Sequence, residues 1–123
     1  MTIVLLMKSM FRARKVDANI IIGGISVYLL IGILWALLYL FLYDLQTGIF
    51  EIDEDGSLFY FSYTTLTTLG YGDILPKGKI ARMLANVEAI SGQIYLTVFV
   101  ARLVGLHIAS EMRSTDDKHG VNT

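Results

Sequence analysis

Residues 18–43 form one apolar stretch that contains no charged side chain, ANIIIGGISVYLLIGILWALLYLFLY. As a helix rising about 1.5 Å per residue it would reach about 39 Å, which exceeds the roughly 30 Å hydrocarbon core of a bilayer. The stretch therefore predicts a transmembrane helix. Gly23, Gly24 and Ser26 within it form a patch of small residues that would let another helix approach closely.

The composition also favours a membrane environment. Of the 123 residues, 54% are hydrophobic and 17% are charged, and a soluble domain could not cover so much apolar surface with so few charges. We therefore expect the lipid bilayer as a partner. The net charge of −1 gives no reason to expect nucleic acid, and the absence of cysteine excludes disulfides, thiolate metal sites and cysteine nucleophiles.

A second apolar stretch, residues 80–109, predicts another membrane helix, although Arg82, Glu88 and Arg102 interrupt it. Charged side chains are tolerated better in a helix that packs inside a larger assembly, with one face on water, than in a helix surrounded by lipid. This second span therefore also predicts protein neighbours.

The basic residues outside the two spans predict their orientation. They precede the first span and follow the second: Lys8, Arg12, Arg14 and Lys15, then Arg113 and Lys118. The positive-inside rule places both termini in the cytoplasm and the connection outside the cell membrane. Residues 1–17 are expected either as an amphipathic helix on the membrane surface or as a partly disordered basic leader, and residues 110–123 as a short cytoplasmic tail.

The connection contains a third apolar segment, residues 57–67, which is too short to span a bilayer. It fits a re-entrant helix that enters the membrane and stops there. The sequence TTLGYGD at residues 67–73 would then provide irregular backbone at membrane depth. Such backbone is tolerated only where it is buried in protein or lines a water-filled path.

Gly70 and Gly72 are two residues apart in this segment. Successive carbonyls of an extended chain alternate sides, and turning them all to one side needs residues of opposite backbone handedness in alternation. Glycine suits this geometry because it adopts positive φ at little cost. Residues 68–72, together with the Thr68 hydroxyl, could thus present a column of oxygens that replaces water around a cation.

The heptapeptide TTLGYGD resembles the signature filter of potassium channels, whose commonest form is Thr-Val-Gly-Tyr-Gly-Asp. The order of segments is also similar to that of the two-transmembrane pore family: outer helix 18–43, external loop 44–56, pore helix 57–67, filter 68–72 and inner helix 80–109. The resemblance implies an all-α membrane protein with two transmembrane helices, a re-entrant pore helix and a selectivity-filter loop. It also implies a homotetramer, because one loop supplies a quarter of each oxygen ring.

The resemblance implies roles for single residues as well. The filter would coordinate ions through Thr68, Leu69, Gly70, Tyr71 and Gly72, with K⁺ held at the first four. The side chains of Leu69 and Tyr71 would pack outward against the pore helix, and Asp73 would lie at the outer mouth. Leu69 stands where valine is commonest, a conservative change because its carbonyl binds the ion.

Two further positions depart from part of the family. Some members bond the outer-mouth aspartate from a pore-helix tryptophan and carry a glutamate behind the filter. This chain is expected to have Phe61 and Thr64 at those positions. Because Phe61 cannot donate a hydrogen bond, we do not carry over the inactivation behaviour of those members.

Gly92 lies where the inner helix of the family often carries a gating hinge. A hinge and close packing against another helix would explain this glycine equally well. Counted from Gly92, the residues Gln93, Leu96 and Val100 share a helix face that could line the inner cavity, or could simply contact other helices.

Three ionisable residues of the second span need separate explanations. Glu88 is predicted to make structural hydrogen bonds at the back of the pore helix, or with a neighbouring subunit, rather than to bind ions. The hydroxyls expected nearby belong to Tyr63, Thr64 and Thr65. Arg102 is expected to reach the cytoplasmic interface, and His107 to lie at that interface rather than to sense pH.

The function we expect is a potassium-selective pore that conducts K⁺ passively and needs no cofactor. Two alternatives stay open: a weakly selective cation pore of the same architecture, and a non-conducting membrane subunit of a larger complex. No span carries arginine at every third position, so no voltage sensor is predicted. An enzyme is not expected, because no nucleophile–base pair is evident and the Gly-Tyr-Gly lacks the lysine of a phosphate-binding loop.

Overall fold

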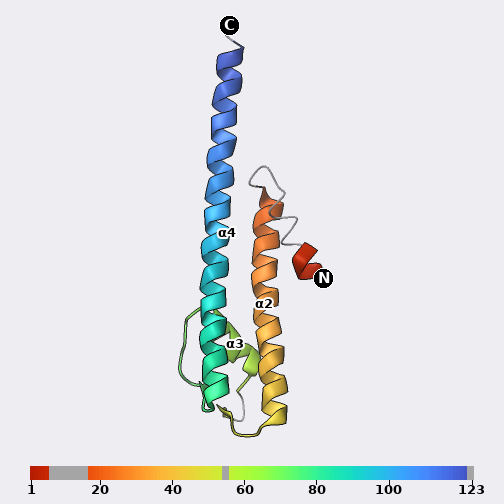
Figure 1. Ribbon diagram of the computed structural model, residues 1–123, viewed down its shortest axis with the longest axis vertical. Helices are drawn as coiled ribbons and strands as arrows, with labels where there is room; N and C mark the ends of the chain where they lie inside the picture. Colours follow the sequence, from red (N-terminus) through yellow and green to blue (C-terminus); the bar gives the residue numbers. More distant parts are fainter. Residues whose placement is uncertain (6–16, 54–55, 122–123) are drawn as a thin grey trace. The chain divides into compact units, whose positions relative to one another are not determined.

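The computed structural model describes residues 1–5, 17–53 and 56–121 of the chain. Three helices account for most of them: α2 (Ala18–Leu45), α3 (Leu58–Leu66) and α4 (Lys79–Gly120) (Figure 1). Two short strands, β1 (Phe50–Glu51) and β2 (Leu75–Pro76), pair antiparallel. The expected class, a mostly helical protein with two long apolar helices and a short helix between them, is confirmed.

The two long helices extend beyond the predicted spans. α2 begins directly after Asp17, whose side chain accepts a hydrogen bond from the Ala18 amide at 2.8 Å, and it ends two residues past the expected boundary. α4 does not end at residue 109 but continues to Gly120, so most of the expected tail is helical. Contacts four residues apart accompany this extension, such as the 3.5 Å pair between His107 and Glu111.

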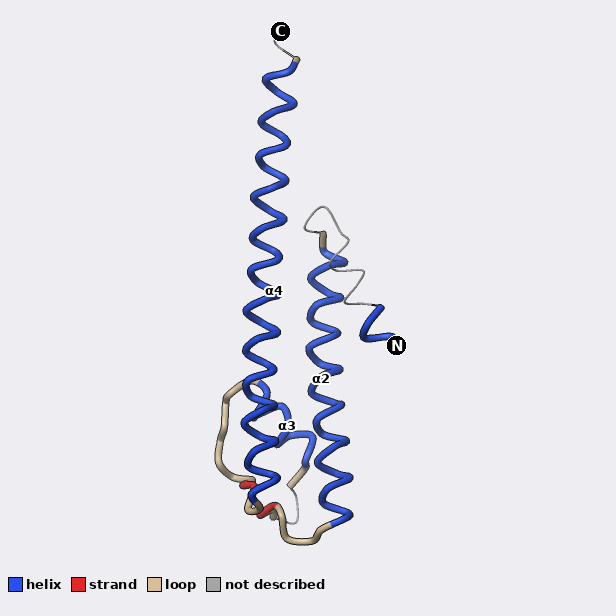
Figure 2. The backbone as a smooth tube through the Cα atoms, in the orientation of Figure 1, coloured by secondary structure: helices blue, strands red, loops and turns tan. Residues whose placement is uncertain are grey.

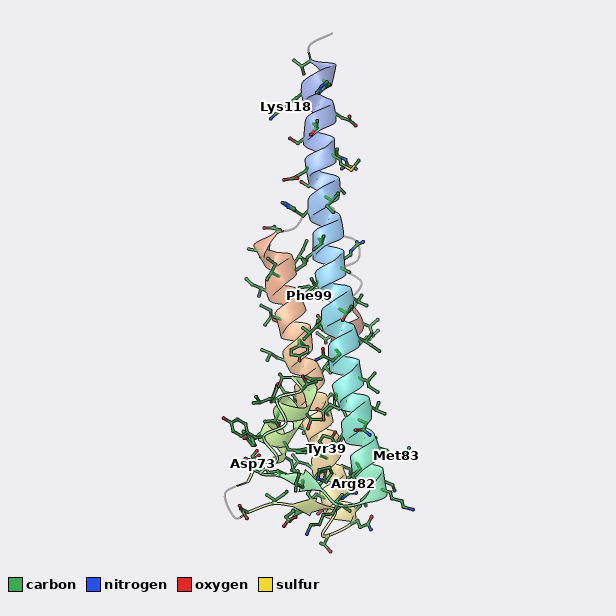
Figure 3. All side chains as sticks on the ribbon, turned by 90° about the vertical axis from the view of Figure 1, so that its left-hand side faces the viewer. Tyr39, Asp73, Arg82, Met83, Phe99 and Lys118 are labelled. Carbon is green, nitrogen blue, oxygen red and sulfur yellow. The ribbon has the colours of Figure 1, made fainter. Side chains whose placement is uncertain are left out.

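The chain divides into two compact units, one made of residues 28–95 and the other of residues 1–27 with 96–123. Both long helices therefore contribute to both units. In the second unit, the ring of Phe99 lies against Gly24 (Figure 3), where a Cβ would overlap it. One glycine of the predicted small-residue patch thus admits a close neighbour. The basic residues predicted for the N-terminal segment (Lys8, Arg12, Arg14 and Lys15) lie outside the described residues.

α2 and α4 are both long and apolar enough to cross a membrane. The buried positions of α2 follow one stripe of the helix, including Val27, Ala36 and Tyr39, while its other faces expose leucine, isoleucine and phenylalanine. A helix that is apolar on all faces is typical of a membrane span, where lipid or neighbouring helices contact the side chains that the chain itself leaves exposed.

Within residues 28–95, α3 lies between α2 and α4 (Figures 1 and 2). An aromatic cluster formed by Tyr39, Phe50 and Phe61 fills the space at its amino-terminal half. Their rings meet edge to face with centroids 5.2–5.4 Å apart, a favourable geometry for aromatic pairs. The remaining buried residues of this core are Ile49, Leu58, Ile74 and Ala81.

The strand pair connects the segment before α3 with the segment after the glycine-rich turn (Figure 2). Phe50 is opposite Pro76, and the Lys77 amide donates to the Ile49 carbonyl at 2.7 Å. An ion pair between Lys77 and Glu51, at 3.2 Å, lies beside this ladder. These contacts hold the segment before α3 close to the segment that follows the glycine-rich turn.

We predict that Phe61→Ala strongly destabilises the protein, because it removes the ring on which Tyr39 and Phe50 both pack. Truncating a buried phenylalanine to alanine costs about 3–5 kcal/mol. Thermal unfolding of the detergent-solubilised protein measures the effect. Phe41→Ala is the matched control, because the Phe41 side chain on α2 is 61% exposed and should be nearly neutral. Equal losses in the two variants would contradict the importance of the cluster.

Candidate ion-conduction site

The backbone of the glycine-rich turn alternates in handedness. Thr68, Gly70 and Gly72 have positive φ values of 60°, 55° and 78°, while the residues between them do not. Positive φ at the two glycines was predicted and is confirmed. Positive φ at Thr68 was not predicted, because side chains with a branched Cβ rarely adopt it. The alternation meets the condition for turning successive carbonyls to one side.

The turn is attached to the carboxyl end of α3. The Thr67 amide donates to the Tyr63 carbonyl at 3.1 Å, and the Thr68 amide donates to the Thr65 carbonyl at 3.0 Å. The Gly70 amide reaches back to the Thr64 carbonyl, also at 3.0 Å. Helix ends leave carbonyls without partners inside the helix, and the turn satisfies several of them here. The position of α3 therefore sets the position of the turn.

α2 holds α3 from one side through side-chain hydroxyls. Tyr63 donates to the Leu29 carbonyl at 2.8 Å, and Tyr28 donates to the Leu66 carbonyl at 3.2 Å. Gly32 allows the two helices to come close, because a Cβ at this position would overlap the ring of Tyr63. The carbonyl of Gly32 accepts a further hydrogen bond from Ser62 at 2.8 Å. These contacts bring α3 against the backbone of α2.

α4 holds α3 from the other side, and Gly92 lies at the contact. The residue is buried, and a Cβ there would overlap the carbonyl oxygen of Leu66 and lie 2.9 Å from the Leu66 Cδ1 atom. Close packing, one of the two explanations for this glycine, therefore has a direct structural reason. Its use as a gating hinge stays a prediction.

Glu88 lies fully buried between the three helices. Its Oε2 atom accepts a hydrogen bond from the Tyr39 hydroxyl at 2.5 Å, and its Oε1 atom lies 2.5 Å from the Ser62 hydroxyl oxygen. A hydrogen-bonding role behind α3 was predicted and is confirmed, but the predicted partners are wrong. Two of those hydroxyls bond backbone carbonyls instead: Tyr63 bonds Leu29, and Thr64 bonds Phe61.

Asp73 has a polar neighbour on α3, Tyr60, that was not predicted from the sequence. Tyr60 lies beside Asp73, and desolvation followed by its interaction with the Asp73 carboxylate raises the pKa of Tyr60. Phe61, the residue that was compared with the family's tryptophan, points into the aromatic cluster instead. The Asp73 carboxylate also accepts the Ile74 amide at 3.1 Å. Figure 3 labels Asp73 near the outer edge of residues 28–95.

The side chains of the turn do not pack on their own chain. Leu69 is 60% exposed and Tyr71 is 72% exposed, so the expected packing of both against the pore helix does not occur within one copy. The cause is geometric, because α3 already presents its buried residues to α2, α4 and the loop core. Two large apolar side chains next to irregular backbone are thus left for another surface to cover.

The residues assigned to the inner cavity lie on α4 beyond this contact. Gln93 and Val100 are exposed and Leu96 is half-buried in the single chain. This exposure is compatible with both predicted uses, a cavity lining and contacts with other helices, so the assignment stays a prediction. Arg102 is half-buried, and His107 is exposed next to Glu111.

A family of ion channels matches residues 25–107, more than half of the chain. The chain belongs to this ion channel family. The matched region contains the whole of α3, the glycine-rich turn and the part of each long helix that contacts α3. Members of the family are not enzymes, and they use no cofactor. Among the described residues, no three His, Cys, Asp or Glu side chains form a group that could hold a metal ion.

Two curated potassium channels are similar to parts of the chain. Inward rectifier potassium channel Kirbac3.1 of Paramagnetospirillum magnetotacticum is 37% identical over 76 residues, which cover 59% of this chain and 24% of that protein. Two-pore potassium channel 4 of Arabidopsis thaliana is 38% identical over 52 residues, or 42% of this chain and 18% of that protein. The chain thus spans about a quarter or less of each relative. No solved structure matches it significantly.

We predict that Gly92→Ala destabilises the protein, because its methyl group would overlap the Leu66 carbonyl. Forcing an extra methyl group into a packed contact costs about 1–3 kcal/mol. Gly105→Ala on the same helix is the matched control, because the space that its Cβ would occupy is open and alanine favours a helix by about 1 kcal/mol. Thermal unfolding in detergent measures both. If Gly92 served only as a hinge, both alanines would stabilise the helix.

Proposed function

We propose that this chain is the pore-forming part of a potassium-selective channel in which four identical copies surround one filter. K⁺ crosses the membrane passively through a column of oxygens supplied by Thr68, Leu69, Gly70, Tyr71 and Gly72, and Asp73 lies at the outer mouth. The alternating backbone handedness of residues 68–72 carries this proposal, because it lets successive carbonyls face one axis.

The exposed side chains of the turn support an assembly of several copies. Leu69 and Tyr71 are mostly exposed in one chain, and irregular backbone at membrane depth must be buried in protein or line water. Contact with neighbouring copies would cover these side chains while the backbone faces the central path. Four copies follow from the ring of oxygens that a potassium ion needs, since each copy supplies one strand of the column.

Potassium is proposed as the permeant ion because both curated relatives are potassium channels by name. The Gly-Tyr-Gly sequence of the turn also resembles the potassium filter. A weakly selective cation pore of the same architecture is the nearest alternative, since selectivity depends on how firmly the filter is held. In the proposed topology both long helices cross the cell membrane and both termini lie in the cytoplasm. The connection between the helices, residues 44–79, lies on the outer side and re-enters the membrane with α3 and the turn.

The same proposal includes roles for residues of α4 and for the carboxyl end of α3. Gly92 would act as a gating hinge in addition to its packing contact, and Gln93, Leu96 and Val100 would line the water-filled cavity below the filter. The carboxyl end of α3 would direct its partial negative charge toward that cavity and favour a cation there.

The proposal predicts that Gly72→Ala abolishes potassium selectivity. Alanine at φ 78° is strained by about 1–2 kcal/mol, so the residue should turn its carbonyl away from the column. Purified protein in liposomes is assayed for K⁺ flux, and reversal potentials with K⁺ on one side and Na⁺ on the other give the permeability ratio. The ratio should fall to near one, or the flux should be lost.

Gly48→Ala is the matched control for this experiment. Gly48 also has positive φ, 86°, with open space around it, but it lies in the loop before β1 and outside the turn. It should carry the same strain and keep the wild-type permeability ratio. Undiminished selective flux in Gly72→Ala would contradict the filter geometry. Equal K⁺ and Na⁺ permeability in the wild type would favour the weakly selective pore. A wild-type tetramer that conducts no ions would favour a non-conducting subunit.

A further inference from the structure

A buried group of oxygens joins the three helices behind the turn, and we call it the Glu88 cluster. It consists of the Glu88 carboxyl group on α4, the hydroxyls of Tyr39 on α2 and Ser62 on α3, and the backbone carbonyl of Gly32 on α2. Both polar side chains beside the carboxyl group are fully buried, as is Glu88 itself. Three contacts connect the cluster, at 2.5, 2.5 and 2.8 Å.

The cluster needs three hydrogens for its three contacts. The Gly32 carbonyl is only an acceptor, so the 2.8 Å contact requires the single hydroxyl hydrogen of Ser62. The Tyr39 hydroxyl supplies the hydrogen for its contact with Glu88 Oε2. The contact between Ser62 Oγ and Glu88 Oε1 then has no hydrogen left from a hydroxyl. Only the carboxyl group can provide it.

An ionised carboxylate fits this arrangement poorly. Ser62 would have to donate to Glu88, and its oxygen would then lie 2.8 Å from the Gly32 carbonyl oxygen with no hydrogen directed between them. Glu88 also has no ion pair with any described residue. A buried charge without a counter-charge is costly in a protein interior and more so at membrane depth. Both considerations favour the neutral acid.

We propose that Glu88 is held as a neutral carboxylic acid that donates a hydrogen bond from Oε1 to Ser62 Oγ. The bonds then run in one direction: Glu88 donates to Ser62, Ser62 donates to the Gly32 carbonyl, and Tyr39 donates to Glu88 Oε2. Every polar atom of the cluster is satisfied. Glu88 is thereby a positioning residue, because it fixes α3 between the two long helices.

The cluster acts on the turn through α3, and this part of the inference rests on the proposed channel function. Ser62 lies two residues before Thr64, whose carbonyl accepts the Gly70 amide. A rotation or tilt of α3 would therefore move the hydrogen-bond acceptors that hold the turn. A firmly placed α3 is what a selective filter of residues 68–72 requires.

Glu88→Gln separates the neutral acid from the ionised form. The glutamine amide can donate to Ser62 Oγ and its carbonyl can accept from Tyr39, so it reproduces every bond of the neutral acid. The thermal midpoint in detergent and the K⁺/Na⁺ permeability ratio should both remain at wild-type values. Glu88→Ala should lower the folded-to-unfolded ratio about tenfold or more, because it leaves the buried Tyr39 hydroxyl without an acceptor and the buried Ser62 oxygen without its donor. A Glu88→Gln protein as damaged as Glu88→Ala would overturn the proposal.

Infrared spectroscopy tests the proton directly and does not depend on conduction. The wild-type protein at neutral pH should show the carbonyl stretch of a protonated carboxylic acid, and this band should be absent from Glu88→Gln. Absence of the band from the wild type would overturn the proposal even if Glu88→Gln were stable. A band in a protein that conducts no K⁺ would uphold the neutral acid while rejecting the proposed function.

Discussion

The position of α3 is the constraint on which the rest of the structure depends. A helix of nine residues cannot span a bilayer, so it can stay at membrane depth only where its ends and faces have partners. Hydroxyls and carbonyls from α2 bond one side, and α4 closes the other side through Gly92 and Glu88. The amides of the turn complete the carboxyl end. The turn therefore takes its geometry from three helices at once.

Two kinds of contact hold α3, close packing and hydrogen bonds, and they require different residues. Gly92 is needed because the α3 backbone lies too close for a side chain, and Gly32 because the Tyr63 ring does. The hydroxyls of Tyr28 and Tyr63, by contrast, reach backbone carbonyls of the facing helix. Neither kind depends on the hydrophobic effect, which is weak between helices that lipid surrounds. Close packing and buried hydrogen bonds hold such helices together instead. The chain combines both kinds around one short helix.

Much of this arrangement could be predicted from the sequence, because long uncharged stretches and paired glycines have few physical explanations. The partners of Glu88 could not, since a helix turns about 100° per residue and one register error exchanges an outward residue for an inward one. The same error of one residue explains why Phe61 was expected at the position next to Asp73, whereas the structure places Tyr60 there. Positive φ at Thr68 could not be predicted for another reason, because it runs against the preference of a residue with a branched Cβ.

Large side chains of the turn are exposed in one copy, and this exposure links the folding of the chain to its assembly with other copies. A single copy in a bilayer would place Leu69, Tyr71 and the irregular backbone around them against lipid, where unsatisfied peptide groups are costly. Contact with other copies removes that cost only when the turns meet at a common axis. In the proposed tetramer the stability of one copy would then depend on the concentration of the others, as in obligate oligomers. In the proposed channel the completed filter is thus a condition of stable folding as well as the path of the ion.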